Sequence, residues 1–270
     1  MLDVFGFPTP QQSNYQEFYG GGTTRDWVKP RGVSMVRFML IGAGGGGGVG
    51  SATVGAGGGG SGAVTSWIGP AIFVPDILRI TIGVGGTSGV NGTASSVIYQ
   101  AKDETGYTLL TANGGTSGTA GVITAGVGGT ASTNNYFGAS GIFRTIEGQD
   151  GSDGNATGNG ANTNNSTTTF LSGGAGGAGS AAGTGGGVTP NYGYVPLPVT
   201  TAGGLVAGAD GYFITQPILV GTGGAGGTTS QAVGTSGGKG GIGCGGGGSG
   251  EDATTVSGAG GDGAVFIWSW

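Results

Sequence analysis

Four oxygen-bearing side chains lie close together between residues 147 and 155 and are the best candidates for metal chemistry. The stretch EGQDGSDGN places Glu147, Asp150, Asp153 and Asn155 among glycines. Carboxylate and amide oxygens are the ligands that Ca²⁺ prefers. Their spacing matches no standard calcium loop, and Asp and Asn beside glycine are typical of turns. We therefore expect turns here, with Asp150, Asp153 and Asn155 as only a weak calcium candidate and no other metal site.

The sequence contains few of the residue patterns that enzymes use for catalysis. The chain has no histidine, which excludes a Ser-His-Asp arrangement, and its scattered carboxylates form no catalytic signature. The stretch GAGGGG from Gly42 follows a strand-like segment and imitates a dinucleotide-binding fingerprint. No amphipathic helix and no suitably placed acidic residue follow it. We expect a protein that is not an enzyme and that uses no cofactor.

Charge and cysteine content narrow the classes of partner. The 270 residues include 8 Lys plus Arg against 13 Asp plus Glu, without a basic cluster, so nucleic acid is not an expected partner. The single cysteine, Cys244, excludes an intramolecular disulfide and indicates a small apolar filler among glycines. No signal peptide and no membrane-spanning run are evident. The sequence thus predicts no membrane insertion and synthesis in the cytoplasm of a host cell.

The elements that must position any site are short strands. Val33 to Ile41 is apolar on both faces, which predicts a central strand covered on two sides. Further strands are predicted at 63–68, 77–82 and 95–100, and at 107–111, which should form a hairpin with 95–100. We expect Ala264 to Trp270 to pair with the first of these strands. The fold class predicted is all-β, an antiparallel sandwich-like core.

Glycine supplies 73 of the 270 residues, and its runs carry a three-residue repeat. Between residues 173 and 187, Ala175, Ala178, Ala181 and Thr184 recur at every third position. A polyproline-II-like helix has three residues per turn, so one edge would carry small side chains and two edges would be bare backbone able to pack side by side. The two alternatives are polyglycine II helices packed in this way and irregular glycine-rich loops.

Three stretches give the chain a resemblance to a known family. A tryptophan, valine, proline and glycine precede the strand and GAGGGGG (residues 27–48); GTASSVIYQAKDETGYTLLTANGG (92–115) reads as an internal hairpin; and GGDGAVFIWSW (260–270) closes the chain. Together, over about residues 26–270, they resemble the glycine-rich domains of tailed-phage virion proteins, often tail fibres. A more distant likeness is to the polyglycine-helix adhesins of phage tail fibres.

The first 25 residues differ from the rest and are expected to form an N-terminal docking arm, followed by a glycine-rich β domain at 26–270. The arm is aromatic and has no sustained periodicity, so it cannot build a core of its own. It either docks on another chain or folds back over the sandwich. The docking candidates are Phe5, Phe7, Tyr15, Phe18 and Tyr19.

Aromatic residues flanked by Asn, Thr and Gly are the candidates for recognition. Stiff rings lose little conformational entropy on binding, whereas Asn, Ser and Gly adapt. The segments Ser132 to Gly138 and Gly160 to Phe170 read as exposed loop tips, and 192–198 alternates aromatics with prolines. The receptor-contact candidates are Tyr136, Phe137, Tyr192 and Tyr194. Packing of these rings on neighbouring loops is the alternative.

The resemblance implies a non-enzymatic protein on the surface of a phage virion. It favours a receptor-binding adhesin at a tail fibre or spike, whose partners are a host cell-surface glycan or protein and, through the arm, other virion proteins. The alternative is a capsid decoration protein, a cement or head-fibre protein anchored by the arm. The short segment before the domain, with no shaft, favours this alternative. We expect a homo-oligomer, as is common for such appendages.

Overall fold

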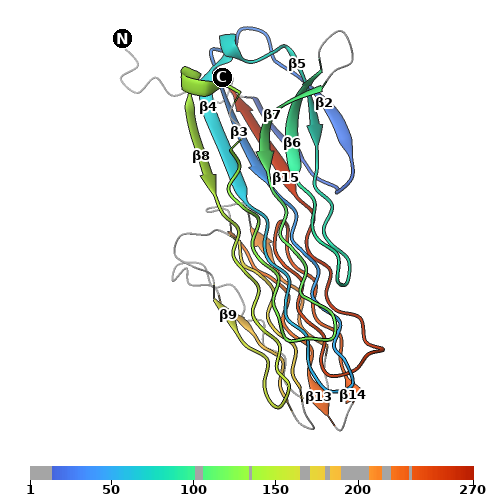
Figure 1. Cartoon of the computed structure of the whole chain (residues 1–270). Coiled ribbons are helices and arrows are strands. Elements are labelled where there is room, and N and C mark those ends of the chain that lie inside the picture. The colour runs from blue at the N-terminus through green and yellow to red at the C-terminus, as the bar shows by residue number, and fades with distance from the viewer. Residues whose placement is uncertain are drawn as a thin grey trace.

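The computed structural model describes residues 14–100, 106–133, 136–164, 171–179, 183–189, 207–214, 220–230 and 233–270. The molecule is elongated, with two β-sheets at one end and long parallel glycine-rich segments at the other (Figure 1). We call these two parts the sheet half and the glycine half. The prediction of an all-β fold dominated by antiparallel pairing is confirmed.

A five-stranded antiparallel sheet forms one layer of the sheet half. Its order is β1-β15-β3-β4-β8, so β3 is central, as its apolar faces predict. β15 pairs with β3 over its whole length, with Ala264 opposite Ile41. The predicted pairing of the closing strand is therefore confirmed. The strands are β1 (Asn14–Phe18), β15 (Ala264–Ser269), β3 (Met35–Ile41), β4 (Val64–Pro70) and β8 (Ile142–Ile146).

A four-stranded antiparallel sheet of order β2-β5-β6-β7 forms the second layer. β6 and β7 form the predicted hairpin, with a register shift between Val97 and Ile98. The predicted strands at 77–82, 95–100 and 107–111 match β5, β6 and β7 to within a residue. The strands are β2 (Thr24–Val28), β5 (Ile77–Thr81), β6 (Ser95–Gln100) and β7 (Gly106–Ala112).

A conventional hydrophobic core joins the two sheets. Phe38 of β3 lies edge to face on Trp27 of β2, with ring centroids 5.6 Å apart. Leu78 and Ile80 of β5 and Val97 of β6 complete the cluster from the second sheet. Because large side chains of both sheets interdigitate between them, the sheet half is a β-sandwich.

The segment expected to be an arm contains β1 and the first two residues of β2. β1 pairs with β15, Asn14 lying opposite Ser269, and β2 pairs with β5. The sequence reading missed both strands because their exposed faces carry polar residues. The second half of the segment 1–25 is thus built into the two sheets, and residues 1–13 lie outside the described residues.

The glycine half contains little regular secondary structure. Leaving the sheets, the chain runs down and back many times as extended glycine-rich segments, which appear side by side in Figure 1. The strands of the glycine half have two residues each: β9 (Thr163–Asn164), β10 (Val188–Thr189), β11 (Phe213–Ile214), β12 (Val220–Gly221), β13 (Thr229–Ser230) and β14 (Val233–Gly234).

Two 3₁₀ turns, η1 (Ala71–Phe73) and η2 (Gly138–Ser140), lie at the end of the sheet half that faces away from the glycine runs (Figure 1).

Successive amides of one glycine run bond to three different neighbours. Gly44 donates to the carbonyl of Gly261 and Gly47 to that of Gly258, each at 2.9 Å. Gly45 and Gly48 donate instead to the run 57–60. The amide of Gly46 donates to a third segment, at the carbonyl of Val90. Amides i and i+3 therefore face the same neighbour, as a helix with three residues per turn requires. The packed-helix alternative is the one that the structure contains.

Close backbone contacts explain why the runs are glycine. A Cβ added to Gly47 would lie 2.0 Å from the carbonyl oxygen of Gly247, and one on Gly59 would lie 2.2 Å from that of Gly45. The Cα–H groups thus point at carbonyl oxygens of adjacent runs, in contacts that supplement the N–H bonds. Neither glycine has a positive φ, and the amides of the extended run 44–48 bond to other segments and not along the run, so the three-residue turns have the left-handed sense of polyglycine II. Close approach, and not backbone flexibility, is what requires glycine here.

Candidate functional site

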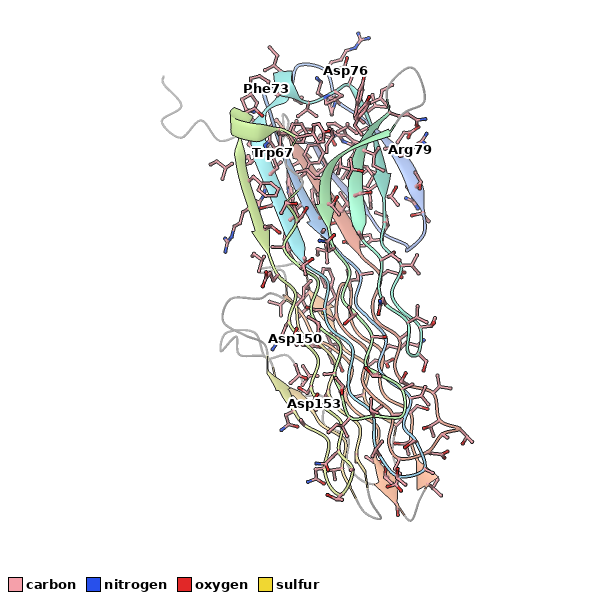
Figure 2. All side chains as sticks on the ribbon, in the orientation of Figure 1. Trp67, Phe73, Asp76, Arg79, Asp150 and Asp153 are labelled. Atoms are coloured by element: carbon pink, nitrogen blue, oxygen red, sulfur yellow. The ribbon has the colours of Figure 1, made fainter. Side chains whose placement is uncertain are left out.

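The two carboxylates of the calcium candidate serve the glycine bundle. Asp150 Oδ1 accepts a hydrogen bond from the amide of Gly128 at 2.7 Å, and Asp153 Oδ1 accepts one from the amide of Ala125 at 2.9 Å. The two residues lie on the flank of the glycine half, one turn apart (Figure 2). Each carboxylate satisfies a backbone N–H that faces outwards from a peripheral run.

Asn155 has a local role. Its Oδ1 accepts from the amide of Thr157 and its Nδ2 donates to the carbonyl of Asn159, both at 2.9 Å. Among the described residues, no three His, Cys, Asp or Glu side chains gather where a metal ion could bind. The turn interpretation of this stretch holds for Asn155, which makes local bonds, but not for Asp150 and Asp153, whose carboxylates accept hydrogen bonds from distant glycine-rich runs.

Side-chain oxygens cap the bundle in the same way at many other positions. Ser249 Oγ accepts from the amide of Gly50, and Asp262 accepts from the amides of both Gly21 and Gly85. A buried backbone donor without a partner is costly, and at the rim of the lattice no further run is available. The acceptors include Asn91, Asn159, Asn162, Thr93, Thr116, Thr222, Thr235 and Asp210. We call this set the capping oxygens.

The receptor-contact candidates do not form one surface. Phe137 is buried and its ring stacks on that of Trp67, with centroids 4.2 Å apart. Tyr136 beside it is 68% exposed and lies next to η2, at the sheet end of the molecule. Phe137 therefore belongs to the core, which was the alternative for these rings. Tyr192 and Tyr194 lie outside the described residues.

The loop segments that read as exposed tips are also partly buried. Ser132 and Thr163 are both buried, and the Thr163 hydroxyl donates to the carbonyl of Gly174 at 3.0 Å. The expectation of exposed tips is thus wrong for these two residues, because Asn/Thr-rich sequence also supplies hydrogen bonds to glycine runs. Residues 134–135 and 165–170 lie outside the described residues.

Three docking-arm candidates pack on the sheets of their own chain. Tyr15 stacks on Trp268 of β15 at 5.0 Å, Phe18 is buried in the sandwich core, and Tyr19 meets Phe266 edge to face at 5.7 Å. The other two candidates, Phe5 and Phe7, lie outside the described residues. For Tyr15, Phe18 and Tyr19 the structure agrees with the alternative in which the segment folds back on the sandwich.

An aromatic ladder with charged neighbours covers the outer face of the five-stranded sheet. The Arg37 guanidinium lies 4.9 Å from the centre of the Trp268 ring, on which Tyr15 also stacks. Burial, followed by a hydrogen bond to Glu17 and the negative charge of Glu17, raises the pKa of Tyr19 to about 12. The ring faces are occupied by neighbours, so this ladder stabilises cross-strand pairs.

A more open surface lies at the end of the sheet half farthest from the glycine runs. Four large apolar side chains are exposed there: Val28 at 61%, Ile72 at 85%, Phe73 at 55% and Ile77 at 59%. Figure 2 shows Phe73 and Asp76 projecting from this end. We call the residues 28–33 and 71–77 the sheet-end surface. Exposed apolar groups in such a cluster typically mark an interaction site.

A lysine holds the sheet-end surface in shape. Lys29 Nζ donates to the carbonyls of Ala71 and Val74, at 3.2 and 2.7 Å, and forms an ion pair with Asp76 at 2.8 Å. These bonds fix the turn that carries Ile72 and Phe73. A hollow of about 520 Å³ lies between this turn and the Pro30–Gly32 turn. A second of about 610 Å³ continues past Asp76 and Arg79.

Sequence reasoning missed this surface, although a signal was present. The stretch PAIFVPD places two large apolar residues inside a turn bracketed by Pro70 and Pro75. Turns normally carry polar residues, so Ile72 and Phe73 at such a position indicate contact with something outside the turn.

Cys244 lies where the sandwich meets the glycine bundle. It is fully buried in an apolar cluster with Ile41, Leu171 and Phe266, and burial raises the pKa of its thiol to about 12. The thiol is therefore protonated at neutral pH, as expected of a small apolar filler. Within the part of the chain that the structure describes, no helix is long and apolar enough to cross a membrane.

Comparison with known proteins agrees with the glycine-dominated architecture. No curated protein sequence is significantly similar to the chain. Residues 19–269 match the family described as a glycine-rich domain. This match covers nearly the whole chain, including both sheets and the glycine bundle, and the chain therefore belongs to the glycine-rich domain family.

Proposed function

We propose that the chain is a non-enzymatic protein of a phage virion surface, a receptor-binding adhesin of a tail fibre or spike that recognises a glycan or protein on the host cell. The observation that carries the proposal is the polarity of the fold. Asn14 pairs with Ser269, and Trp270 bonds to Met35 at the sheet end, so both described ends of the chain lie together. The glycine runs project in the opposite direction (Figure 1).

The glycine bundle suits the presentation of variable loops. Each run is bonded on several sides, so the scaffold is rigid, while the turns between runs make fewer bonds to neighbouring runs. Loops on a rigid scaffold are the usual place for recognition residues. The turns near residues 51–54, 119–123 and 252–256 include exposed apolar side chains, namely Val122, Ile123 and Val256. The resemblance to phage tail-fibre domains supports the same proposal.

Adsorption measurements test the proposal. We expect the purified chain to bind host cells and to compete with phage adsorption. Replacing Val122 and Ile123 together with Ser should reduce competition at least tenfold while leaving the melting temperature unchanged. Tyr192→Ala with Tyr194→Ala tests the predicted aromatic loop in the same assay. A control, Ile142→Ser, alters an exposed apolar side chain of β8 in the sheet half and should compete like the original chain.

The capsid decoration alternative gives a different outcome. Antibody against the chain would then label heads and not tails in micrographs of intact virions. The loop variants would leave adsorption unchanged, and particles without the chain would lose resistance to heat. Labelling of heads, or unchanged adsorption in all loop variants, would overturn the adhesin proposal.

A further inference from the structure

Charge is distributed very unevenly between the two halves of the molecule. Among the described residues, the sheet half carries six Lys and Arg against three Asp and Glu, whereas the glycine half carries one against seven. The chain is acidic as a whole, with a net charge of −5. Within the described residues the charges are nevertheless separated along the molecule, with a net positive sheet half, and such separation steers association.

The sheet-end surface combines positive charge with exposed apolar groups. Arg31 lines the hollow beside Ile72 and has no ion pair among the described residues, whereas Lys29 is paired with Asp76. The turn bearing Ile72 and Phe73 is held by the Lys29 bonds, so little entropy is lost when it docks. A partner for this end needs negative charge and apolar contacts.

The far end of the glycine half carries both negative charge and exposed apolar side chains. Glu251 and Asp252 follow the last central run, and the backbone of Glu251 abuts Gly234 of β14. Exposed apolar residues flank them, Val233 at 58% and Val256 at 62%. β14 lies at the bottom of Figure 1, at the end of the molecule opposite the sheet-end surface. We call residues 233–234 and 251–256 the glycine-end surface.

We propose that the sheet-end surface of one copy docks on the glycine-end surface of a second copy, so that chains associate head to tail along their long axis. The two surfaces are complementary in charge, and both offer exposed apolar residues for burial. Such a contact joins different patches, so it leaves one free surface of each kind at the ends and can repeat. The last copy of such a stack would present its loops freely.

Sedimentation of the full chain tests the proposal. The mass of the solute should rise above the chain mass of 25.6 kDa with increasing concentration at an ionic strength of about 0.02 M. It should return to that of the monomer at about 0.5 M, where the Debye length is only a few ångströms. A solute that stays monomeric at all concentrations and low salt would overturn the proposal.

Two single-surface variants make the test specific. Phe73→Asp places a carboxylate on the sheet-end surface and Val256→Lys places a cation on the glycine-end surface; each variant alone should be monomeric. A mixture of the two should form one-to-one dimers and nothing larger, because each retains one intact surface. Val127→Asp is the matched control, since Val127 is 56% exposed on the flank of the bundle. It should associate like the original chain.

Other occupants give other results. If Val256→Lys still associates while Phe73→Asp does not, the sheet-end surface pairs with itself and the head-to-tail proposal is wrong. If deletion of residues 1–13 abolishes association while both variants associate normally, the N-terminal segment makes the contact instead, which also overturns it.

Discussion

Phe38 and Gly47 lie in continuous segments of one chain, yet their surroundings have almost nothing in common. Phe38 is fully buried among rings, with Trp27 at 5.6 Å and Trp67 at 6.1 Å. Gly47 is equally buried, but its neighbours are the carbonyls and amides of other glycine runs. The sandwich excludes water with large side chains, whereas the bundle excludes it with backbone and small side chains such as those of Ala175 and Ala178.

The difference shows that a buried interior does not require large apolar residues. In the bundle, each run satisfies its N–H groups on neighbouring runs and its Cα–H groups contact further carbonyls. The entropy lost by glycine on ordering is large, and here many inter-run hydrogen bonds offset it. The capping oxygens complete the lattice where the runs end.

Amide exchange compares the two halves most directly. The amides of Gly174, Ala175 and Gly176 donate to three different neighbouring runs, at Gly59, Gly224 and Ala161. We expect residues 173–179 to exchange as slowly as β3, with protection equivalent to about 5 kcal/mol or more. Mass spectrometry of peptides from both regions measures this. Exchange within seconds throughout 173–179 would show that the runs are not packed helices.

Truncating a ring tests the sandwich. Phe38→Ala removes a fully buried side chain from between Trp27 and Trp67, and should cost about 3–5 kcal/mol of unfolding free energy. Denaturant titration followed by tryptophan fluorescence measures it. A loss below about 1 kcal/mol would mean that the bundle, and not the sandwich, sets the stability of the molecule.

Adding a single methyl group tests the bundle. Gly47→Ala would place a Cβ 2.0 Å from a backbone oxygen, so a run must shift, at a cost of about 3 kcal/mol. Gly158→Ala is the control, because the nearest atom to its Cβ would be 3.9 Å away and its φ is not positive. That change should be neutral or stabilise by up to about 1 kcal/mol. Equal effects at both positions would contradict close packing of the runs.

Removing one capping oxygen should have a smaller effect. Asp150→Ala leaves the amide of Gly128 without its acceptor, and we expect a loss of about 1–2 kcal/mol. Asp150→Asn retains an acceptor oxygen and should lose less. If added Ca²⁺ raises the melting temperature of the original chain but not of Asp150→Ala, the weak calcium interpretation would have to be restored.

The smallest change is expected at an exposed ion pair. The Arg79 Nε to Asp26 Oδ1 distance is 3.7 Å, and both side chains are largely exposed. Asp26→Asn should therefore alter the unfolding free energy by about 0.5 kcal/mol or less. A much larger loss in thermal melts would show that surface charge contributes to the stability of the sheet half.

Much of the sandwich was predictable because its strands have strong apolar patterns. β3, β6 and β15 carry side chains whose alternation or length reveals burial. β1 and β2 could not be recognised, because Gln16, Glu17, Arg25 and Asp26 hide the pattern behind polar residues. Only their pairing with β15 and β5 explains why they are strands.

The glycine half was predictable in kind but not in arrangement. The three-residue repeat indicates the helix type, yet one glycine run resembles another, so the repeat pattern does not reveal which runs are neighbours. The candidate site was predicted least well. Phe137 is of a residue type that is common at recognition surfaces, yet its ring packs in the core on Trp67. Aromatic rings are used both in binding and in packing, so residue type alone does not distinguish the two. The exposed position of Ile72 and Phe73 could not be predicted from periodicity, because two residues are too few to form a periodic pattern.

The hydrogen-bond period of the runs also constrains how such a protein can vary in evolution. Inserting three residues into a run restores every amide to the neighbour it faced before, whereas inserting one or two turns them all towards the wrong neighbour. A polyglycine II turn rises by about 9 Å, so matched insertions would lengthen the projection in discrete steps of that size. The length of the bundle can thus change in multiples of three residues per run, without any change to the sandwich or to the loops at the end of the bundle.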